Sequence, residues 1–217
     1  MCRPFLKGLE SLDQAGLDGS RLPSHSQLSK SLFNNSGWRI ETVPGLIPVR
    51  DFLALLGDRR FPAPLWIRGY GNLEYTPEAD AFHDLFGHIP QLLRPEFCVL
   101  LESLSDQAAA ANDETMLRIE RLYWFSFEFG LTLENGELRA IGAGLASSVG
   151  ELERSLHSDR VERLAFTRDR ACSTPFSANE QQALYLVAES TESLKTCLHL
   201  RGNGDRSQGE GQSLGPR

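Results

Sequence analysis

The chain has 217 residues, of which 41% are apolar, enough to bury the core of one large domain. Its formal net charge is −7, so charge gives no reason to expect nucleic acid or an anionic membrane as a partner. No apolar run approaches the roughly 18 residues of a membrane span, and the first residues lack the apolar stretch of a signal peptide. The four cysteines are scattered, as is typical of free thiols in a reducing compartment. We therefore expect a cytoplasmic protein.

The first third of the chain predicts short helices and short strands. Residues 1–36 are polar, and their two helix-like stretches, FLKGLESLDQAGL and SQLSKSLFNN, are interrupted by glycine and proline. The next segment contains the β-type runs WRIETV and LWIRGY on either side of a helix candidate, VRDFLALLG. The pattern predicts a short helical segment at residues 1–36 and a main domain at residues 37–200. Residues 201–217 are of low complexity and are expected to be disordered.

From Pro77 onward the pattern is mainly helical. PEADAFHDLFGH predicts a helix that begins at Pro77 with Thr76 as its N-cap and ends at Gly87, while Pro90 keeps it from resuming at once. PEFCVLLESLSDQAAAA and DETMLRIERLYWFSFEFGLTL predict two longer helices. An Asn-Gly pair predicts a hairpin between LTL and LRAIG, and LYLVAES predicts a strand before a closing helix. The expected fold class is mainly α with small β elements.

Three residues are candidate metal ligands. His83 and His88 are five positions apart, which corresponds to about 140° on an ideal helix, so a straight helix could not direct both toward one ion. A bend at Gly87 would bring them together. Glu128 is the only charged residue in LYWFSFEFGLTL, and an ionised carboxylate in apolar surroundings needs a cation or strong donors to compensate its desolvation.

The residue types alone leave several kinds of site open. Two imidazoles and one carboxylate on one side of an ion suit a non-haem Fe(II) centre that activates O₂, but zinc hydrolases use the same ligand types. Aromatic neighbours of Glu128 favour an oxidant acting on an aromatic substrate; they are Trp124, Phe125, Phe127 and Phe129. Without a metal, the histidines would be a helix-end pair and Glu128 would form an ion pair with Arg68 or Arg118.

Four ordered blocks resemble the pterin-dependent aromatic amino acid hydroxylases, and most closely the bacterial phenylalanine 4-hydroxylases. The blocks are GLIPVRDFLALL, YTPEADAFHDLFGHIP, LYWFSFEFGL and GAGLASSVGEL, and the resemblance runs from about Leu22 to Leu198. It implies a single catalytic domain of this type, shortened at its N-terminus, that hydroxylates the ring of a free aromatic amino acid. The implied cofactors are Fe(2+), held by His83, His88 and Glu128, and tetrahydropterin (tetrahydrobiopterin or a related pterin), with O₂ as co-substrate.

The resemblance also implies the pterin and substrate positions. Positions that match pterin contacts are Gly45, Leu46, Ile47, Phe52, Tyr123 and Asp84, the last acting through water. Arg68 lies where the family binds the substrate carboxylate, a task suited to a guanidinium, and Asp80 would orient it. The other substrate positions are Thr76, Trp124 and Ser147. No side chain is expected to act as a general acid or base.

The resemblance favours L-phenylalanine as substrate and L-tyrosine as product. Trp124 resembles the phenylalanine and tyrosine enzymes, and the apolar Ala178 stands where the tyrosine enzyme places an acidic residue. The alternatives are tryptophan 5-hydroxylation, phenylalanine 3-hydroxylation, and a degenerate member that binds metal, pterin or amino acid without turnover. The sequence shows neither the N-terminal regulatory domain nor the heptad tail of tetrameric members, so a monomer or dimer is expected.

Overall fold

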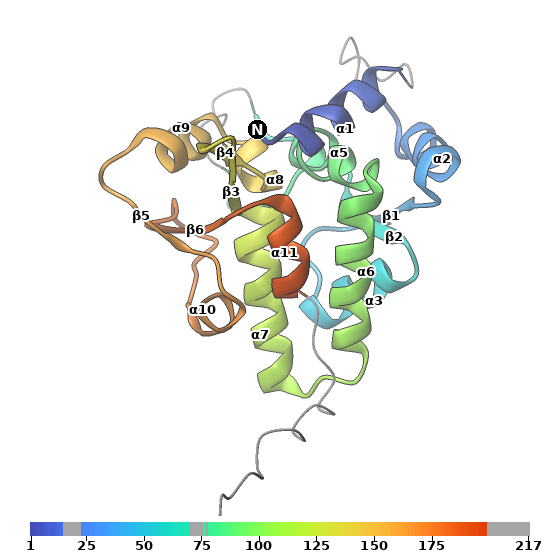
Figure 1. Cartoon of the computed structure of the whole chain (residues 1–217). Helices are drawn as coiled ribbons and strands as arrows, with labels where there is room; N and C mark the ends of the chain where they lie inside the picture. Colours follow the sequence, from blue (N-terminus) through green and yellow to red (C-terminus); the bar gives the residue numbers. More distant parts are fainter. Residues whose placement is uncertain (15–22, 70–75, 77, 199–217) are drawn as a thin grey trace, which may run out of the picture.

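The computed structural model describes residues 1–14, 23–69, 76 and 78–198 of the chain. It is mainly helical with two small sheets, which confirms the expected fold class. The helices α6 (Pro95–Ala109) and α7 (Asp113–Tyr123) stand side by side in Figure 1, and α11 (Thr191–Leu198), which contacts α6, lies between them in that view. Within the described residues, no helix is long and apolar enough to cross a membrane. The predicted tail at residues 201–217 lies outside the described residues.

Two N-terminal helices, α1 (Arg3–Gln14) and α2 (His25–Ser36), pack on the rest of the domain. Ser24 caps α2 in a capping box with Gln27, which satisfies backbone donors at the helix start. Phe5 of α1 is buried in the same apolar cluster as Phe97, and α1 packs against α5 (Ile89–Leu92). The boundary predicted between residues 1–36 and 37–200 stays a prediction.

A parallel pair of strands follows, formed by β1 (Arg39–Val43) and β2 (Arg60–Pro64) and connected through α3 (Val49–Gly57). The strand β1 and the helix α3 agree with the sequence patterns WRIETV and VRDFLALLG. The strand predicted at LWIRGY is wrong, because β2 precedes that run. Its sequence RFPAP tolerates two prolines since a strand in a two-stranded sheet has one unpaired edge, where no N–H is needed.

The helix that carries the two candidate histidines differs from the prediction at both ends. Its first part, α4 (Ala81–His83), begins at Ala81 rather than Pro77, and Asp80 rather than Thr76 is its N-cap, accepting a bond from the His83 N–H. The helix also does not end at Gly87. It continues through a π-helical turn, η2 (Asp84–His88), into α5, and Pro90 falls in the first turn of α5, where a missing N–H is tolerated.

The long helices α6 (Pro95–Ala109) and α7 (Asp113–Tyr123) confirm the two helices predicted in this region. At its C-terminal end, α7 passes into a second π-helical turn, η3 (Trp124–Glu128). The N–H of Phe129 closes this turn by donating to the carbonyl of Trp124, at 2.8 Å. Glu128 is therefore the last residue of η3.

A four-stranded sheet in the order β4-β3-β6-β5 completes the domain. The Asn-Gly turn joins β3 and β4 as an antiparallel hairpin, with both turn residues at positive φ, while β6 pairs in parallel with β3 and β5. The strands are β3 (Leu131–Glu134), β4 (Glu137–Ala140), β5 (Glu162–Ala165) and β6 (Leu184–Ala188). The remaining helices are α8 (Ala143–Ala146), α9 (Val149–His157), α10 (Arg168–Ser173) and α11 (Thr191–Leu198).

The contact between α1 and α5 leaves no room for a side chain at Gly8. A Cβ built there would lie 2.0 Å from the carbonyl oxygen of Pro90, which is backbone and cannot turn aside. We therefore expect Gly8→Ala to lower the free energy of unfolding by about 1–3 kcal/mol, because overpacking outweighs the roughly 1 kcal/mol that alanine gains in helix propensity. Urea unfolding measures the difference. Gly69→Ala is the control, since nothing lies within 4 Å of the Cβ position there. Equal stability of the two variants would contradict the packing of α1 on α5.

Candidate metal and ligand site

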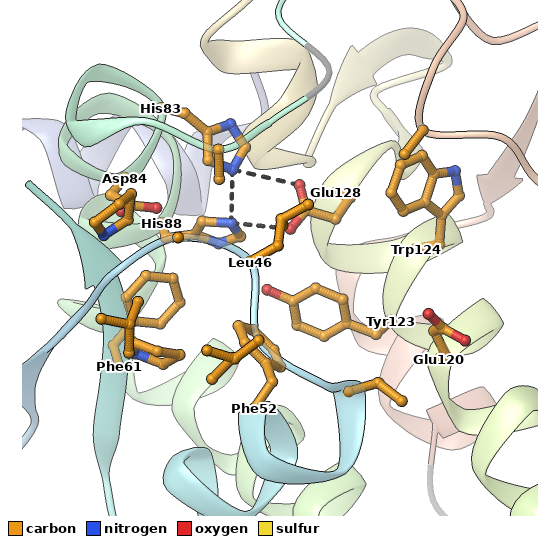
Figure 2. A pocket seen from close by; sticks show the side chains of 18 of the residues that line it. Leu46, Phe52, Phe61, His83, Asp84, His88, Glu120, Tyr123, Trp124 and Glu128 are labelled. Carbon is orange, nitrogen blue, oxygen red and sulfur yellow. Dashed lines mark hydrogen bonds and ion pairs between the residues drawn. The ribbon is translucent and has the colours of Figure 1, made fainter. Parts of the chain in front are cut away.

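The π-helical turn η2 explains the spacing of the two histidines. In a π-turn the backbone bonds run from residue i to i+5, so residues five apart lie one above the other, as residues four apart nearly do in an α-helix. The Nε2 atoms of His83 and His88 are 3.0 Å apart, and both rings are buried (Figure 2). The separation of five residues, which would direct the two histidines apart on a straight α-helix, therefore brings them together in this π-turn.

The second π-turn, η3, brings the carboxylate of Glu128 to the same point. Its oxygens lie 3.0 Å from Nε2 of His88 and 3.6 Å from Nε2 of His83 (Figure 2). The alternative in which Glu128 pairs with Arg68 is wrong, because the guanidinium of Arg68 binds Asp80 at 2.6 Å. The structure thus brings the three candidate ligands together.

Hydrogen bonds on its far side set the tautomer of His83. Its Nδ1 lies 2.8 Å from the hydroxyl oxygen of Ser147, and that hydroxyl donates its one hydrogen to the carbonyl of Ala143 at 2.9 Å. Ser147 must then accept from the Nδ1–H of His83. The Nε2 atom of neutral His83 therefore carries a lone pair, which points toward His88 and Glu128.

A glutamine that the sequence analysis did not single out sets the tautomer of His88. The amide nitrogen of Gln91 is 3.1 Å from each of two carbonyl oxygens, those of Phe127 and Ile141, so its amide oxygen is the acceptor that faces His88. Nδ1 of His88 lies 3.3 Å from that oxygen and donates to it. Gln91 is visible in the sequence only as the residue three positions after His88, and its role depends on tertiary contacts.

The electrostatics of the three groups favour a cation. Burial raises the pKa of the Glu128 carboxyl, but the imidazoles of His88 and His83 outweigh it and hold the pKa at about 2. Burial lowers the pKa of His83 to about 4; at His88 burial acts in the same direction, but Glu128, Asp84 and Gln91 together outweigh it and raise the pKa. One proton on His88 thus balances the carboxylate, and a divalent ion in its place would satisfy both lone pairs and the carboxylate.

Asp84 is a second candidate for the third ligand. Ligand atoms of His83, Asp84 and His88 all lie within 4.8 Å of one another. Burial, however, raises the pKa of Asp84 to about 8, which makes it a neutral acid near pH 7, whereas Glu128 is ionised and close to both histidines. Glu128 is therefore the better ligand. The Oδ2 atom of Asp84 is buried and has no hydrogen-bond partner among the described residues.

A cavity of about 350 Å³ opens beside the three ligands. It is lined by every residue that the resemblance assigned to pterin: Gly45, Leu46, Ile47, Phe52, Asp84 and Tyr123. Phe52 and Tyr123 meet edge to face at 5.2 Å between ring centroids, and Phe61, which the sequence analysis did not single out, lies 4.8 Å from the ring of His88 (Figure 2). The hydroxyl of Tyr123 is buried beside the carboxylate of Glu128, which it contacts, whereas Oδ2 of Asp84 is buried without a partner among the described residues. Aromatic walls beside an unsatisfied polar atom fit a flat heterocycle that forms hydrogen bonds.

A smaller cavity of about 150 Å³ adjoins the first one, and the guanidinium of Arg68 forms part of its lining. Arg68, Thr76, Trp124 and Ser147 line it, while Asp80 lies behind Arg68. The guanidinium donates through Nε and Nη2 to Asp80 and through Nη1 to the carbonyl of Ser147. A guanidinium has five N–H donors, so these three bonds leave donors on the same group for a carboxylate.

Trp124 forms part of the wall of both cavities. Its ring stacks on Phe176 at 4.1 Å between centroids, and its Nε1–H donates to the amide oxygen of Gln182 at 3.0 Å. Gln182 was not predicted, because it lies 58 positions away in the chain and no local pattern marks it. His83 and Glu128 line both cavities as well, so the candidate metal position lies between them.

Comparison with known proteins agrees with this arrangement. Residues 1–201 match the family described as biopterin-dependent aromatic amino acid hydroxylase. The phenylalanine-4-hydroxylase of Chromobacterium violaceum is 38% identical over 194 residues, which cover 89% of this chain and 64% of that enzyme. The tyrosine 3-monooxygenase of Schistosoma mansoni is 36% identical over 195 residues, which cover 89% of this chain and 42% of that enzyme. The chain thus spans less than two thirds of the length of these relatives.

Solved structures show the same likeness. The chain is similar to a C. violaceum phenylalanine hydroxylase structure with bound iron(III) and oxidised 7,8-dihydrobiopterin, with a TM-score of 0.83 and 36% identity over 90% of this chain and 70% of that one. It is also similar to the phenylalanine hydroxylase of Legionella pneumophila, with a TM-score of 0.83 and 32% identity over 91% of this chain and 84% of that one. The chain therefore belongs to the biopterin-dependent aromatic amino acid hydroxylase family.

Proposed function

We propose that this protein is an iron- and tetrahydropterin-dependent monooxygenase that converts free L-phenylalanine to L-tyrosine. The observation that carries the proposal is the convergence of two imidazole lone pairs and one carboxylate between two cavities. His83, His88 and Glu128 would hold Fe(II), because two imidazoles and one carboxylate are the ligand types of non-haem iron centres that activate O₂. The iron, when bound, supplies the site at which O₂ is activated with electrons from a reduced pterin.

The chain's own residues position the reactants and exclude water. In the larger cavity, the ring of Phe52 and the polar atoms of Asp84 and Tyr123 would support the pterin, and Gly45, Leu46 and Ile47 line the same cavity. In the smaller cavity, Arg68 would bind the carboxylate of the amino acid and Asp80 would hold the guanidinium in place. The substrate ring would then lie against Trp124, next to the ligands.

The walls of the substrate cavity support phenylalanine. Trp124 is held by Gln182 and Phe176, so its indole occupies space that a tryptophan substrate would need. Ala178, which lines both cavities, offers no charged group to a substrate hydroxyl. The cytoplasmic location and the monomeric or dimeric state stay predictions from the sequence.

Turnover of the whole chain tests the proposal. Purified protein loaded with Fe(II) and given tetrahydrobiopterin and O₂ should convert L-phenylalanine to L-tyrosine, identified by chromatography and mass, and should act more slowly on tryptophan. 3-Hydroxyphenylalanine as product would instead assign meta hydroxylation. Iron binding without hydroxylated product would identify a binding protein without turnover, and hydrolysis that persists without O₂ and pterin would indicate a zinc enzyme.

The choice between the two carboxylates predicts how three matched variants bind iron. Glu128→Gln removes the ionised group that faces both histidines, so its Fe(II) affinity should fall more than about 100-fold, beyond the usual effect of an outer-shell change. Asp84→Asn should keep one iron per chain. Glu120→Gln is the control, because Glu120 lines the same cavity and forms no ion pair with the histidines. Anaerobic Fe(II) titration measures all three. The reverse order, with iron lost in Asp84→Asn and kept in Glu128→Gln, would assign the third ligand to Asp84.

The pKa shifts predict that the logarithm of the apparent Fe(II) affinity changes by about one per pH unit in mildly acidic solution. Glu128 raises the pKa of His88 above its ordinary value of 6.5, so below that pH iron must displace one proton from His88. The pKa of His83 is about 4, so its proton does not compete until the solution is more acidic. Between pH 5 and pH 6.5, the apparent Fe(II) affinity should therefore fall about tenfold per pH unit. Calorimetric titration in buffers of different ionisation enthalpy measures the protons released. Release of two protons in this range would mean that a second group beside the metal, His83 or Asp84, also loses its proton when iron binds.

A further inference from the structure

We infer that Gln91 is a positioning residue of the metal site, which fixes the ring of His88 and joins it to the turn that carries Glu128. The inference rests on the proposed function, because it concerns how this chain holds the iron. Gln91 does not contact the cavities; it acts through two of the ligands.

Gln91 lies in the core, where each of its polar atoms needs a hydrogen-bond partner. The residue is fully buried, with 0% of its surface exposed, on the short helix α5 directly after the π-turn η2. A buried amide that lacks partners costs free energy, and Gln91 has a partner for its oxygen and two for its nitrogen. A side chain satisfied in this way is held in one rotamer, so it can fix the groups that it touches.

The three bonds of Gln91 join separate parts of the site. Its oxygen accepts from Nδ1 of His88, while its nitrogen donates to the carbonyl of Phe127, the residue before Glu128, and to that of Ile141, just after β4. A displacement of Gln91 would therefore rotate the His88 ring and release the backbone next to Glu128. Two ligands on different π-turns are thus connected by one side chain.

The two histidines donate to different kinds of hydrogen-bond acceptor, so the orientation and electron donation of His88 depend on Gln91. His83 donates to the hydroxyl of Ser147, the residue that follows α8, whereas His88 donates to an amide oxygen from its own helix. An amide oxygen is neutral, so it orients the imidazole without adding the negative charge that a carboxylate partner would bring to the ligand. We therefore expect a change of Gln91 to affect both the geometry and the electron donation of His88.

Substitution by methionine removes all three bonds at similar volume. Gln91→Met should weaken Co(II) and Fe(II) binding about 10–100-fold, the usual effect of losing an outer-shell partner, and should change the visible absorption of the Co(II) protein. Gln107→Met is the matched control: Gln107 also bonds to backbone, but it lies near Leu198 and Arg168, away from the site, and its change should leave both readouts as in the wild type.

Substitution by glutamate changes the charge of the group that faces His88, removes the two bonds to backbone carbonyls, and gives a second test of the inference. Gln91→Glu keeps an acceptor for His88 but makes it a carboxylate, so the Fe(III)/Fe(II) potential should fall below that of the wild type. Wild-type affinity and spectrum in Gln91→Met, or an unchanged potential in Gln91→Glu, would overturn the inference. If the wild-type chain itself bound neither Co(II) nor Fe(II), the proposed function would fail first and the role of Gln91 with it.

Discussion

The molecule is organised around one electrostatic constraint, which is that two imidazole lone pairs and a carboxylate face one another in a buried space. Such groups repel or remain unsatisfied unless a proton or a metal ion lies among them. Regular α-helices could not bring them together at these positions in the sequence. The two π-turns, η2 and η3, do so, and each one places its ligand at the end of the turn. π-Turns are rare in proteins, and those that occur are frequently at functional sites. Here both turns direct their ligands toward the same metal position.

Close backbone packing holds both turns against the same segment, at the start of α8. A Cβ at Gly87 would lie 2.8 Å from the side chain of Ala143, and a Cβ at Gly142 would lie 2.0 Å from the carbonyl of Glu128. Both glycines therefore allow the segment that carries Ser147 to approach the ligands. Asp80 connects the metal ligand His83 to Arg68, because it caps the helix of His83 and also binds the guanidinium of Arg68. One buried carboxylate thus positions a ligand and the group proposed to bind the substrate.

Sequence patterns were sufficient for most helices and the β3–β4 hairpin, and the family resemblance named residues that the structure brings together around two cavities. It failed where regular geometry was assumed. The spacing of His83 and His88 was interpreted as a helix that ends at Gly87, because glycine and proline are common helix terminators, whereas the structure keeps the helix and changes its hydrogen-bond pattern. No local signal distinguishes these two outcomes. Gln91 and Gln182 were missed for a different reason, since each acts through partners that only the tertiary fold brings near.

The support of the metal site extends to the first helix of the chain. Helix α1 packs through Gly8 on the backbone of Pro90, the residue before Gln91. The N–H of Cys2 donates to the carbonyl of Ala140 at 2.7 Å, next to Ile141, whose carbonyl accepts from Gln91. Two contacts of the N-terminal segment thus adjoin the residue that connects His88 to the turn of Glu128. Packed interiors transmit strain. A change that loosens α1 would therefore displace the metal ligands as well as destabilise the fold. The N-terminal segment is in this sense part of the scaffold of the site, although it contributes no residue to either cavity.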